Sequence, residues 1–221
     1  MREMDDLVTN MRISLEKAHV KGVPEYIKRL WANANSANFG DFYLEGRAAL
    51  MFSKAGLDVT IQDSPDLALK FNNKVFYAEV KHFREKEQDK IDAARMSGAG
   101  DLLVPYGDTV PLEGKHACDQ VYDVAKKKIG QYKEYAPNIL VIESSSTSVE
   151  DINIPTVIDT INQDVHSGKC PGLAKLNGIL LASGWYNISQ QWRNVHFFRT
   201  SNPAVPLSRK LLSLLKNIYF G

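Results

Sequence analysis

A predicted β-hairpin in the first half of the chain constrains the fold more than any other feature. Residues 65–81 (PDLALKFNNKVFYAEVK) contain two strand-like runs, with Asn72 and Asn73 between them as a two-residue turn. Both runs are apolar on both faces, which is typical of strands inside a sheet that is covered on each side. We therefore expect a buried sheet with helices packed against it.

Apolar spacing elsewhere predicts helices and strands that alternate around this hairpin. The predicted helices cover residues 5–20, a short segment from Pro24, and residues 41–56, 118–136, 155–166 and 206–218. Further strands are predicted over residues 57–62, 138–143, 177–183 and 194–200. This order predicts an α/β fold in which helices flank a central mixed β-sheet.

The length of 221 residues and the hydrophobic content of 44% suffice for one domain with one core. We expect a single domain over residues 1–221, with a helical N-terminal elaboration at 1–40, a core at 41–143 and a C-terminal part at 144–221. Residues 84–115 lack a regular pattern and are longer than ordinary connections. A lid, a substrate loop and a partly disordered segment each fit this stretch.

Composition limits the protein's partners and its compartment. The net charge of +1 offers no overall attraction for nucleic acid or membrane, so any site for a polyanion must be local. The two cysteines cannot build a disulfide framework and lack the spacing of a structural zinc site. The N-terminus is too acidic for a signal peptide, and no apolar run approaches the ~18 residues of a membrane span. We expect a cytoplasmic protein that does not contact membranes.

The predicted hairpin places two acidic side chains opposite each other. A turn at the two asparagines pairs Phe71 with Lys74, and the same register sets Asp66 opposite Glu79. Directly opposed like charges destabilise a sheet, so a positive group is needed between them. Side chains two residues apart share a face of a strand, which brings Lys81 to the same face as both acids.

This trio of charges suits hydrolysis of a phosphodiester. Mg²⁺ prefers a few carboxylate oxygens and waters, and phosphate oxygens can complete its coordination shell. The metal would withdraw charge from the phosphate and generate hydroxide, while the Lys81 amine would orient or deprotonate the attacking water.

The same residues resemble the motif of the PD-(D/E)xK, or restriction endonuclease-like, nuclease superfamily. The motif stands here as Pro65-Asp66, twelve residues, and then Glu79-Val80-Lys81. The resemblance implies a restriction endonuclease-like fold, in which residues 41–143 form the nuclease core and Mg²⁺ or Mn²⁺ is the cofactor. It implies that Asp66, Glu79 and the Val80 backbone carbonyl bind the metal, and that Lys81 acts on the attacking water. The implied products carry 5′-phosphate and 3′-hydroxyl ends.

Two flanking features are similar to further motifs of this superfamily. Glu45 interrupts an apolar helical stripe, where the family often carries a glutamate on the first helix. Gln131 and Tyr135 form a Q-x-x-x-Y pattern similar to that of RecB-like nuclease domains, on a polar line of the helix predicted over 118–136. The resemblance implies that all three belong to the catalytic site. Lys128 lies on this polar line too, and the lysines at 126–128 fit a solvated face that could neutralise phosphates.

The sequence leaves several alternatives open. DNA is the expected partner, but RNA fits the same chemistry, and a restriction enzyme that cuts both strands would usually be a homodimer. A nucleic-acid-binding module or subunit of the same fold without its own catalysis is the first alternative function. The second is a structural interaction protein whose acidic cluster is an ion-paired core.

Overall fold

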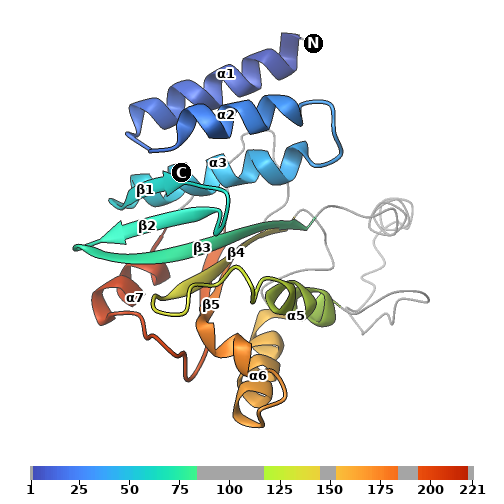
Figure 1. Ribbon diagram of the computed structural model, residues 1–221, viewed down its shortest axis with the longest axis vertical. Helices are drawn as coiled ribbons and strands as arrows, with labels where there is room; N and C mark the ends of the chain where they lie inside the picture. Colours follow the sequence, from blue (N-terminus) through green and yellow to red (C-terminus); the bar gives the residue numbers. More distant parts are fainter. Residues whose placement is uncertain (1, 84–116, 145–152, 184–193, 219–221) are drawn as a thin grey trace, which may run out of the picture.

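A six-stranded sheet organises the chain in the computed structural model, which describes residues 2–83, 117–144, 153–183 and 194–218 (Figure 1). The predicted segment 84–115 lies outside these residues. The described elements are α1 (Arg2–Lys17), α2 (Val23–Ala32), α3 (Phe39–Lys54), β1 (Asp58–Ile61), β2 (Leu67–Phe71), β3 (Lys74–Phe83), α5 (Ala117–Lys127), β4 (Asn138–Ser144), α6 (Asn153–His166), the 3₁₀-helix η1 (Pro171–Lys175), β5 (Leu176–Ser183), β6 (Asn194–Arg199) and α7 (Arg209–Lys216).

The strands lie in the order β1-β2-β3-β4-β5-β6, so neighbours in sequence are also neighbours in the sheet. The first three strands form an antiparallel meander, β3, β4 and β5 run parallel, and β6 returns antiparallel to β5. The prediction of an α/β fold with a mixed sheet and flanking helices is confirmed. No helix among the described residues combines the length and the apolar character needed to cross a bilayer.

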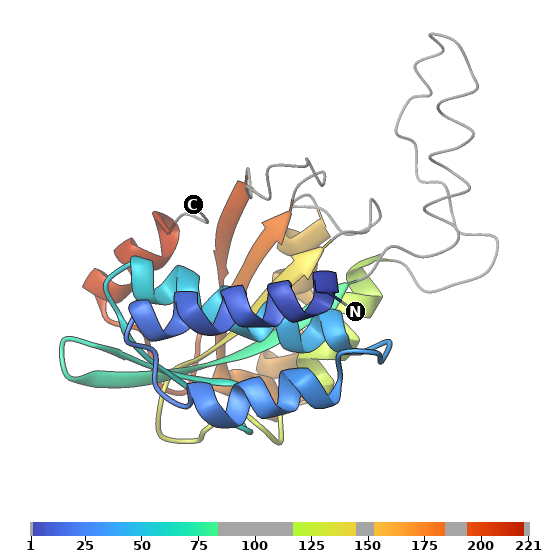
Figure 2. The same ribbon diagram turned by 90° about the horizontal axis from the view of Figure 1, so that it is seen from above.

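Helices cover both faces of the sheet (Figures 1 and 2). Helices α1, α2 and α3 lie on one side, and α5 and α6 lie on the other. Alternate residues of β4 follow this division: Ile139 and Val141 pack with α1–α3, whereas Leu140 and Ile142 pack with α5 and α6. A strand that is buried on both faces needs apolar side chains in both directions, which explains the unbroken apolar run of β4.

The hairpin of β2 and β3 has the predicted register. Phe71 pairs with Lys74, and Leu67 pairs with Ala78. The two turn asparagines at 72 and 73 have φ angles of 49° and 63°. Two successive positive φ angles are typical of a type I′ turn, whose twist matches that of the strands it joins. The turn therefore determines which residues of β2 and β3 face each other.

The connection between α1 and α2 is bound to the edge strand β1. The Lys21 N–H donates to the Val59 carbonyl and the Ile61 N–H donates to the Lys21 carbonyl, both at 2.9 Å. Gly22 follows with a φ of 79°, and a Cβ there would lie 2.1 Å from the Ile61 carbonyl oxygen. Only glycine fits this position. This attachment sets where α2 begins over the sheet.

The prediction of one helix over residues 118–136 was wrong, because α5 ends at Lys127. The side chain of Asn138, at the start of β4, binds the segment between α5 and β4. Its amide nitrogen donates to the carbonyls of Lys133 and Ala136, and its oxygen accepts from the Lys133 N–H at 2.8 Å. These bonds hold residues 133–136 in turns instead of helix. The other predicted elements are present, with ends displaced by three residues or fewer.

Candidate active site

The predicted acids meet where β2 stops pairing with β3. The last paired residues are Leu67 and Ala78, and from Glu79 onward the described residues pair β3 with β4 alone. Asp66 directly precedes β2, and its Oδ2 accepts a hydrogen bond from the Val80 N–H at 2.7 Å. The carboxylate thus takes the place of a strand carbonyl at this open edge of β3.

The backbone of Val80 faces the same edge. In a strand the N–H and C=O groups of one residue point to the same side, and the Val80 N–H points to Asp66. Its carbonyl oxygen is therefore directed toward the edge where Asp66 lies, which is the position that the predicted ligand role requires.

Asp66 and Glu79 are buried together. The Glu79 side chain has no exposed surface, and Asp66 is almost fully buried. Burial, followed by the negative charge of Asp66, raises the pKa of Glu79 to about 7. Burial also raises the pKa of Asp66, although Lys128 and the hydrogen bond from Val80 oppose it. Two carboxyl groups in this relation retain a proton or need a cation.

Glu45 of α3 joins this pair from the helix that covers the sheet. The residue is buried, and its Oε2 lies 3.2 Å from Nη2 of Arg29 on α2. Burial and the charge of Asp66 raise the pKa of Glu45 to about 8, while Arg29 and Lys128 lower it. Arg29 also contacts Asp63 at 2.8 Å. The structure thus brings together three of the predicted acids.

A lysine from α5's end contacts this acidic cluster. Nζ of Lys128 lies 2.6 Å from Oε2 of Glu79, and the Lys128 side chain is only 22% exposed. Burial lowers the pKa of Lys128, but the hydrogen bond to Glu79 and the charges of Asp66, Glu79 and Glu45 outweigh burial and raise it. The ammonium therefore persists and compensates the buried acids.

Lys81, the lysine of the motif, forms a different ion pair. Its Nζ lies 3.3 Å from Oδ2 of Asp41 on α3, and its side chain is 36% exposed. His82 also approaches Asp41, with its Nδ1 4.0 Å from the carboxylate. The ammonium of Lys81 therefore forms its ion pair with a residue of α3 and not with Asp66 or Glu79.

The Q-x-x-x-Y residues lie on the turns after α5 and not on a helix. Gln131 is half-buried, and Tyr135 is 92% exposed. Tyr132 is the buried aromatic residue of this segment, at 3% exposure, and its hydroxyl has no hydrogen-bond partner among the described residues. Burial and the nearby charge of Glu79 raise the pKa of Tyr132. Tyr132 is not part of the Q-x-x-x-Y pattern; its position four residues after Lys128 is the signal in the sequence that relates it to the site.

The residues present fit a hard cation that keeps most of its waters. Within the described ranges, no group of three or more His, Cys, Asp or Glu side chains is arranged to hold a metal. Mg²⁺ needs only one or two carboxylates, because water and substrate phosphate supply its remaining ligands. Oε1 of Glu79 is buried and receives no hydrogen bond from any described residue. This oxygen, the Asp66 carboxylate and the Val80 carbonyl make a suitable oxygen set.

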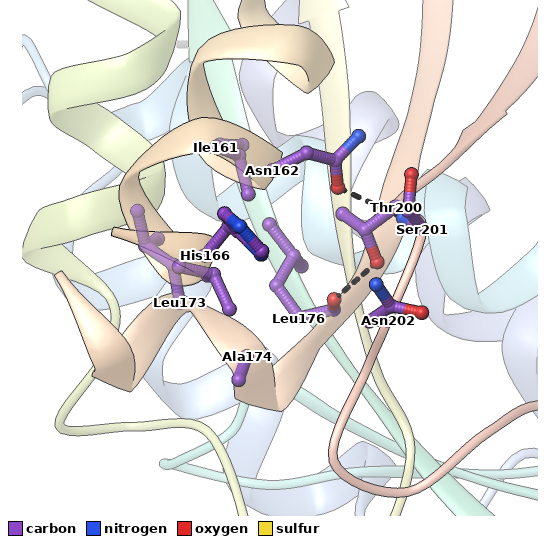
Figure 3. A pocket seen from close by; sticks show the side chains of 10 residues that line it. Ile161, Asn162, His166, Leu173, Ala174, Leu176, Thr200, Ser201 and Asn202 are labelled. Carbon is purple, nitrogen blue, oxygen red and sulfur yellow. Dashed lines mark hydrogen bonds between the residues drawn. The ribbon is translucent and has the colours of Figure 1, made fainter. Parts of the chain in front are cut away.

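A small pocket lies elsewhere, between α6, η1, the first residue of β5 and residues 200–202 after β6 (Figure 3). It encloses roughly 180 Å³ and includes none of the predicted site residues. Its polar groups bind one another: the Thr200 hydroxyl donates to the Leu176 carbonyl at 2.7 Å, and Oδ1 of Asn162 accepts from the Ser201 N–H at 2.8 Å. We therefore consider the acidic cluster, and not this pocket, the candidate active site.

Comparison with known proteins adds no relative: no family model, curated protein or solved structure matches the chain. The function is therefore argued from the geometry of the acidic cluster.

Proposed function

We propose that this protein is a metal-dependent nuclease that hydrolyses DNA phosphodiester bonds with an activated water. The observation that supports this most is the burial of Asp66 against Glu79 at the open edge of β3, with one Glu79 oxygen lacking a donor among the described residues. Two adjacent buried carboxyl groups are unfavourable in a core that has only a structural role. A bound divalent cation would compensate the charge of both carboxylates and so make this arrangement favourable.

Asp66, Glu79 and the Val80 carbonyl would hold Mg²⁺ or Mn²⁺. When bound, such an ion neutralises phosphate charge and makes a bound water more acidic. Glu45 has a pKa of about 8, so it can exchange a proton near neutral pH and orient a water beside the pair. Arg29 keeps the Glu45 carboxylate directed into the cluster. The resemblance of the sequence motif supports a restriction endonuclease-like fold and, for cleavage of both DNA strands, a homodimer. The cysteine content supports a cytoplasmic location.

The test is incubation of the protein with circular DNA, linear DNA and RNA, each under Mg²⁺ and under Mn²⁺. We expect metal-dependent cleavage of DNA, and loss of a closed circle identifies internal scission. Asp66→Asn and Glu79→Gln should abolish cleavage, whereas Glu134→Gln, at an exposed acid paired with Lys175, should not. Equal cleavage by Glu79→Gln and the parent protein would reject the assignment.

A nucleic-acid-binding subunit of the same fold is the second candidate. The ion pair between Lys81 and Asp41 favours it, because the motif lysine is engaged outside the carboxylate pair. Binding of nucleic acid without cleavage under several metals would support this candidate. If a Mn²⁺ soak of crystals leaves Asp66 and Glu79 without metal, the ion-paired structural role gains support instead.

A further inference from the structure

Two side chains on the turn after α5 approach the carboxylates, and neither belongs to the sequence motif. Lys128 and Tyr132 are four residues apart, and the Tyr132 N–H donates to the Lys128 carbonyl at 3.3 Å. This bond maintains helical spacing, which puts the two side chains on the same side of the turn. Lys128 contacts Glu79, and the charge of Glu79 also acts on the Tyr132 hydroxyl.

The two candidate lysines differ in what they neutralise. Lys128 pairs at 2.6 Å with a glutamate that has no exposed surface, whereas Lys81 pairs at 3.3 Å with Asp41, a partly exposed acid. Charge interactions strengthen several-fold as water is excluded, so the buried pair is the stronger of the two. The ammonium of Lys128 also interacts with Asp66 and Glu45. Of the two candidate lysines, Lys128 is therefore the one that neutralises the carboxylate cluster, while Arg29 contacts its third acid, Glu45.

Tyr132 contributes a second observation that is independent of charge. Its hydroxyl oxygen is buried without a partner among the described residues, and the same holds for Oε1 of Glu79. An unsatisfied buried polar group costs about 1–3 kcal/mol, so phenylalanine would suit a purely structural position better. A ligand or a water bound beside Glu79 would supply the hydrogen bonds that these two groups lack among the described residues.

We propose that Lys128 is the catalytic lysine of this site, where its ammonium donates a hydrogen bond to the phosphate under attack, and that Tyr132 is a positioning residue for Glu79. This inference rests on the proposed nuclease function and assigns the amine role to α5's end in place of the motif strand. The 2.6 Å contact between Nζ of Lys128 and Oε2 of Glu79 places the N–H donors of this side chain at the acidic cluster, so we assign it the role of a hydrogen-bond donor. Because the protein has a net charge of only +1, a local cation is needed to bind a phosphate.

The experiment compares Lys128→Gln, Lys128→Arg and Lys81→Gln, with Lys127→Gln as the matched control at the exposed last residue of α5. Cleavage rate and Mn²⁺ affinity by titration calorimetry are measured for each. We expect the cleavage rate of Lys128→Gln to fall about 100-fold, which is typical when one hydrogen-bond donor to the transition state is removed. This loss should be at least tenfold larger than the loss in Lys81→Gln. Loss of the competing ammonium should tighten Mn²⁺ binding by about tenfold. Lys127→Gln should match the parent in both measurements.

Two further variants protect the test against misfolding. Lys128→Arg retains the charge and the fold but alters the donor geometry, so cleavage should fall about tenfold while the melting temperature stays near that of the parent. Tyr132→Phe retains the ring, and it should lower cleavage more than Tyr135→Phe does, without a loss of melting temperature.

The outcomes separate this inference from the proposed function. If the parent cleaves DNA and binds Mn²⁺ but Lys128→Gln behaves like Lys127→Gln, the inference alone is overturned. A larger loss in Lys81→Gln than in Lys128→Gln overturns it as well. If the parent neither binds Mn²⁺ nor cleaves any nucleic acid, the proposed function fails and this inference fails with it.

Discussion

Oδ2 of Asp66 accepts a hydrogen bond from the Val80 N–H at 2.7 Å across the open edge of β3. One side chain thereby satisfies the backbone of the strand and stands beside Glu79 of that strand. This hydrogen bond stabilises the fold, and the same carboxylate belongs to the candidate active site. Substitution of Asp66 by asparagine or by alanine separates the structural role from the metal-binding role.

Asp66→Asn should abolish Mn²⁺ binding without lowering stability. The asparagine oxygen can still accept from the Val80 N–H, and loss of the charge relieves repulsion with Glu79. Asp66→Ala leaves that buried N–H without a partner, so its free energy of unfolding should fall by about 1–3 kcal/mol. Urea denaturation of both variants checks the difference. Equal stabilities for the two variants would contradict the role of this hydrogen bond.

The stability of the metal-free protein should decline as the pH rises. Burial raises the pKa of Glu45 to about 8, and those of Glu79 and Glu143 to about 7, from ordinary values of 4.5. At pH values between the ordinary pKa of 4.5 and the raised pKa values, these carboxyl groups keep their protons in the folded protein but lose them in the unfolded chain. The free energy of unfolding therefore falls with rising pH. We expect a loss of at least ~2 kcal/mol between pH 5 and pH 8, measured by urea denaturation.

Two controls accompany the pH measurement. Glu45→Gln should flatten the decline, because it removes the group with the highest of these pKa values. Addition of Mg²⁺ to the parent should do the same, since a bound cation favours ionised carboxylates. A stability that rises from pH 5 to pH 8 without metal contradicts the raised pKa values.

Gly46→Ala should destabilise the packing of α3 next to Glu45. A Cβ at this position would lie 2.3 Å from the Tyr26 hydroxyl and 2.7 Å from the sulfur of Met11. Overpacking of this kind costs about 1–3 kcal/mol. Thermal unfolding measures the loss, and Gly130→Ala is the matched control, because a Cβ there meets no atom within 4 Å. A Gly46→Ala protein as stable as the Gly130→Ala protein would contradict the close approach of these helices.

Asn138→Ala should weaken both the fold and the site. The two N–H groups of the buried Asn138 amide are shared among the carbonyls of Lys133, Ala136 and Lys175, and its oxygen accepts from the Lys133 N–H, so the variant loses two donated bonds and one accepted bond. At about 1 kcal/mol for each bond, we expect a loss of ~3 kcal/mol and a lower cleavage rate, because the turn carrying Tyr132 loosens. Asn162→Ala, which removes a single bond to Ser201, is the control for urea denaturation and cleavage. A parent-like rate in Asn138→Ala would show that the turn does not position the site.

The sequence by itself determined the β2–β3 hairpin and the juxtaposition of Asp66 and Glu79. Two asparagines in a two-residue turn set the register locally, and strand alternation then decides which side chains share a face. Glu45 was also predictable, because an acid on an otherwise buried helical stripe is directed into the protein. These inferences need only contacts between residues close in sequence.

Only the tertiary structure decided which lysine meets the acids. Lys81 is two residues from Glu79, yet its ammonium reaches Asp41 on α3. Lys128, on the turn after α5, is 49 residues from Glu79 in the chain and contacts it. The end of α5 depends on hydrogen bonds from Asn138, which local helical spacing does not reveal. Which carboxylate a long lysine side chain contacts depends on how the helices pack over the sheet, and the strength of that contact depends on burial, which is a property of the assembled layers.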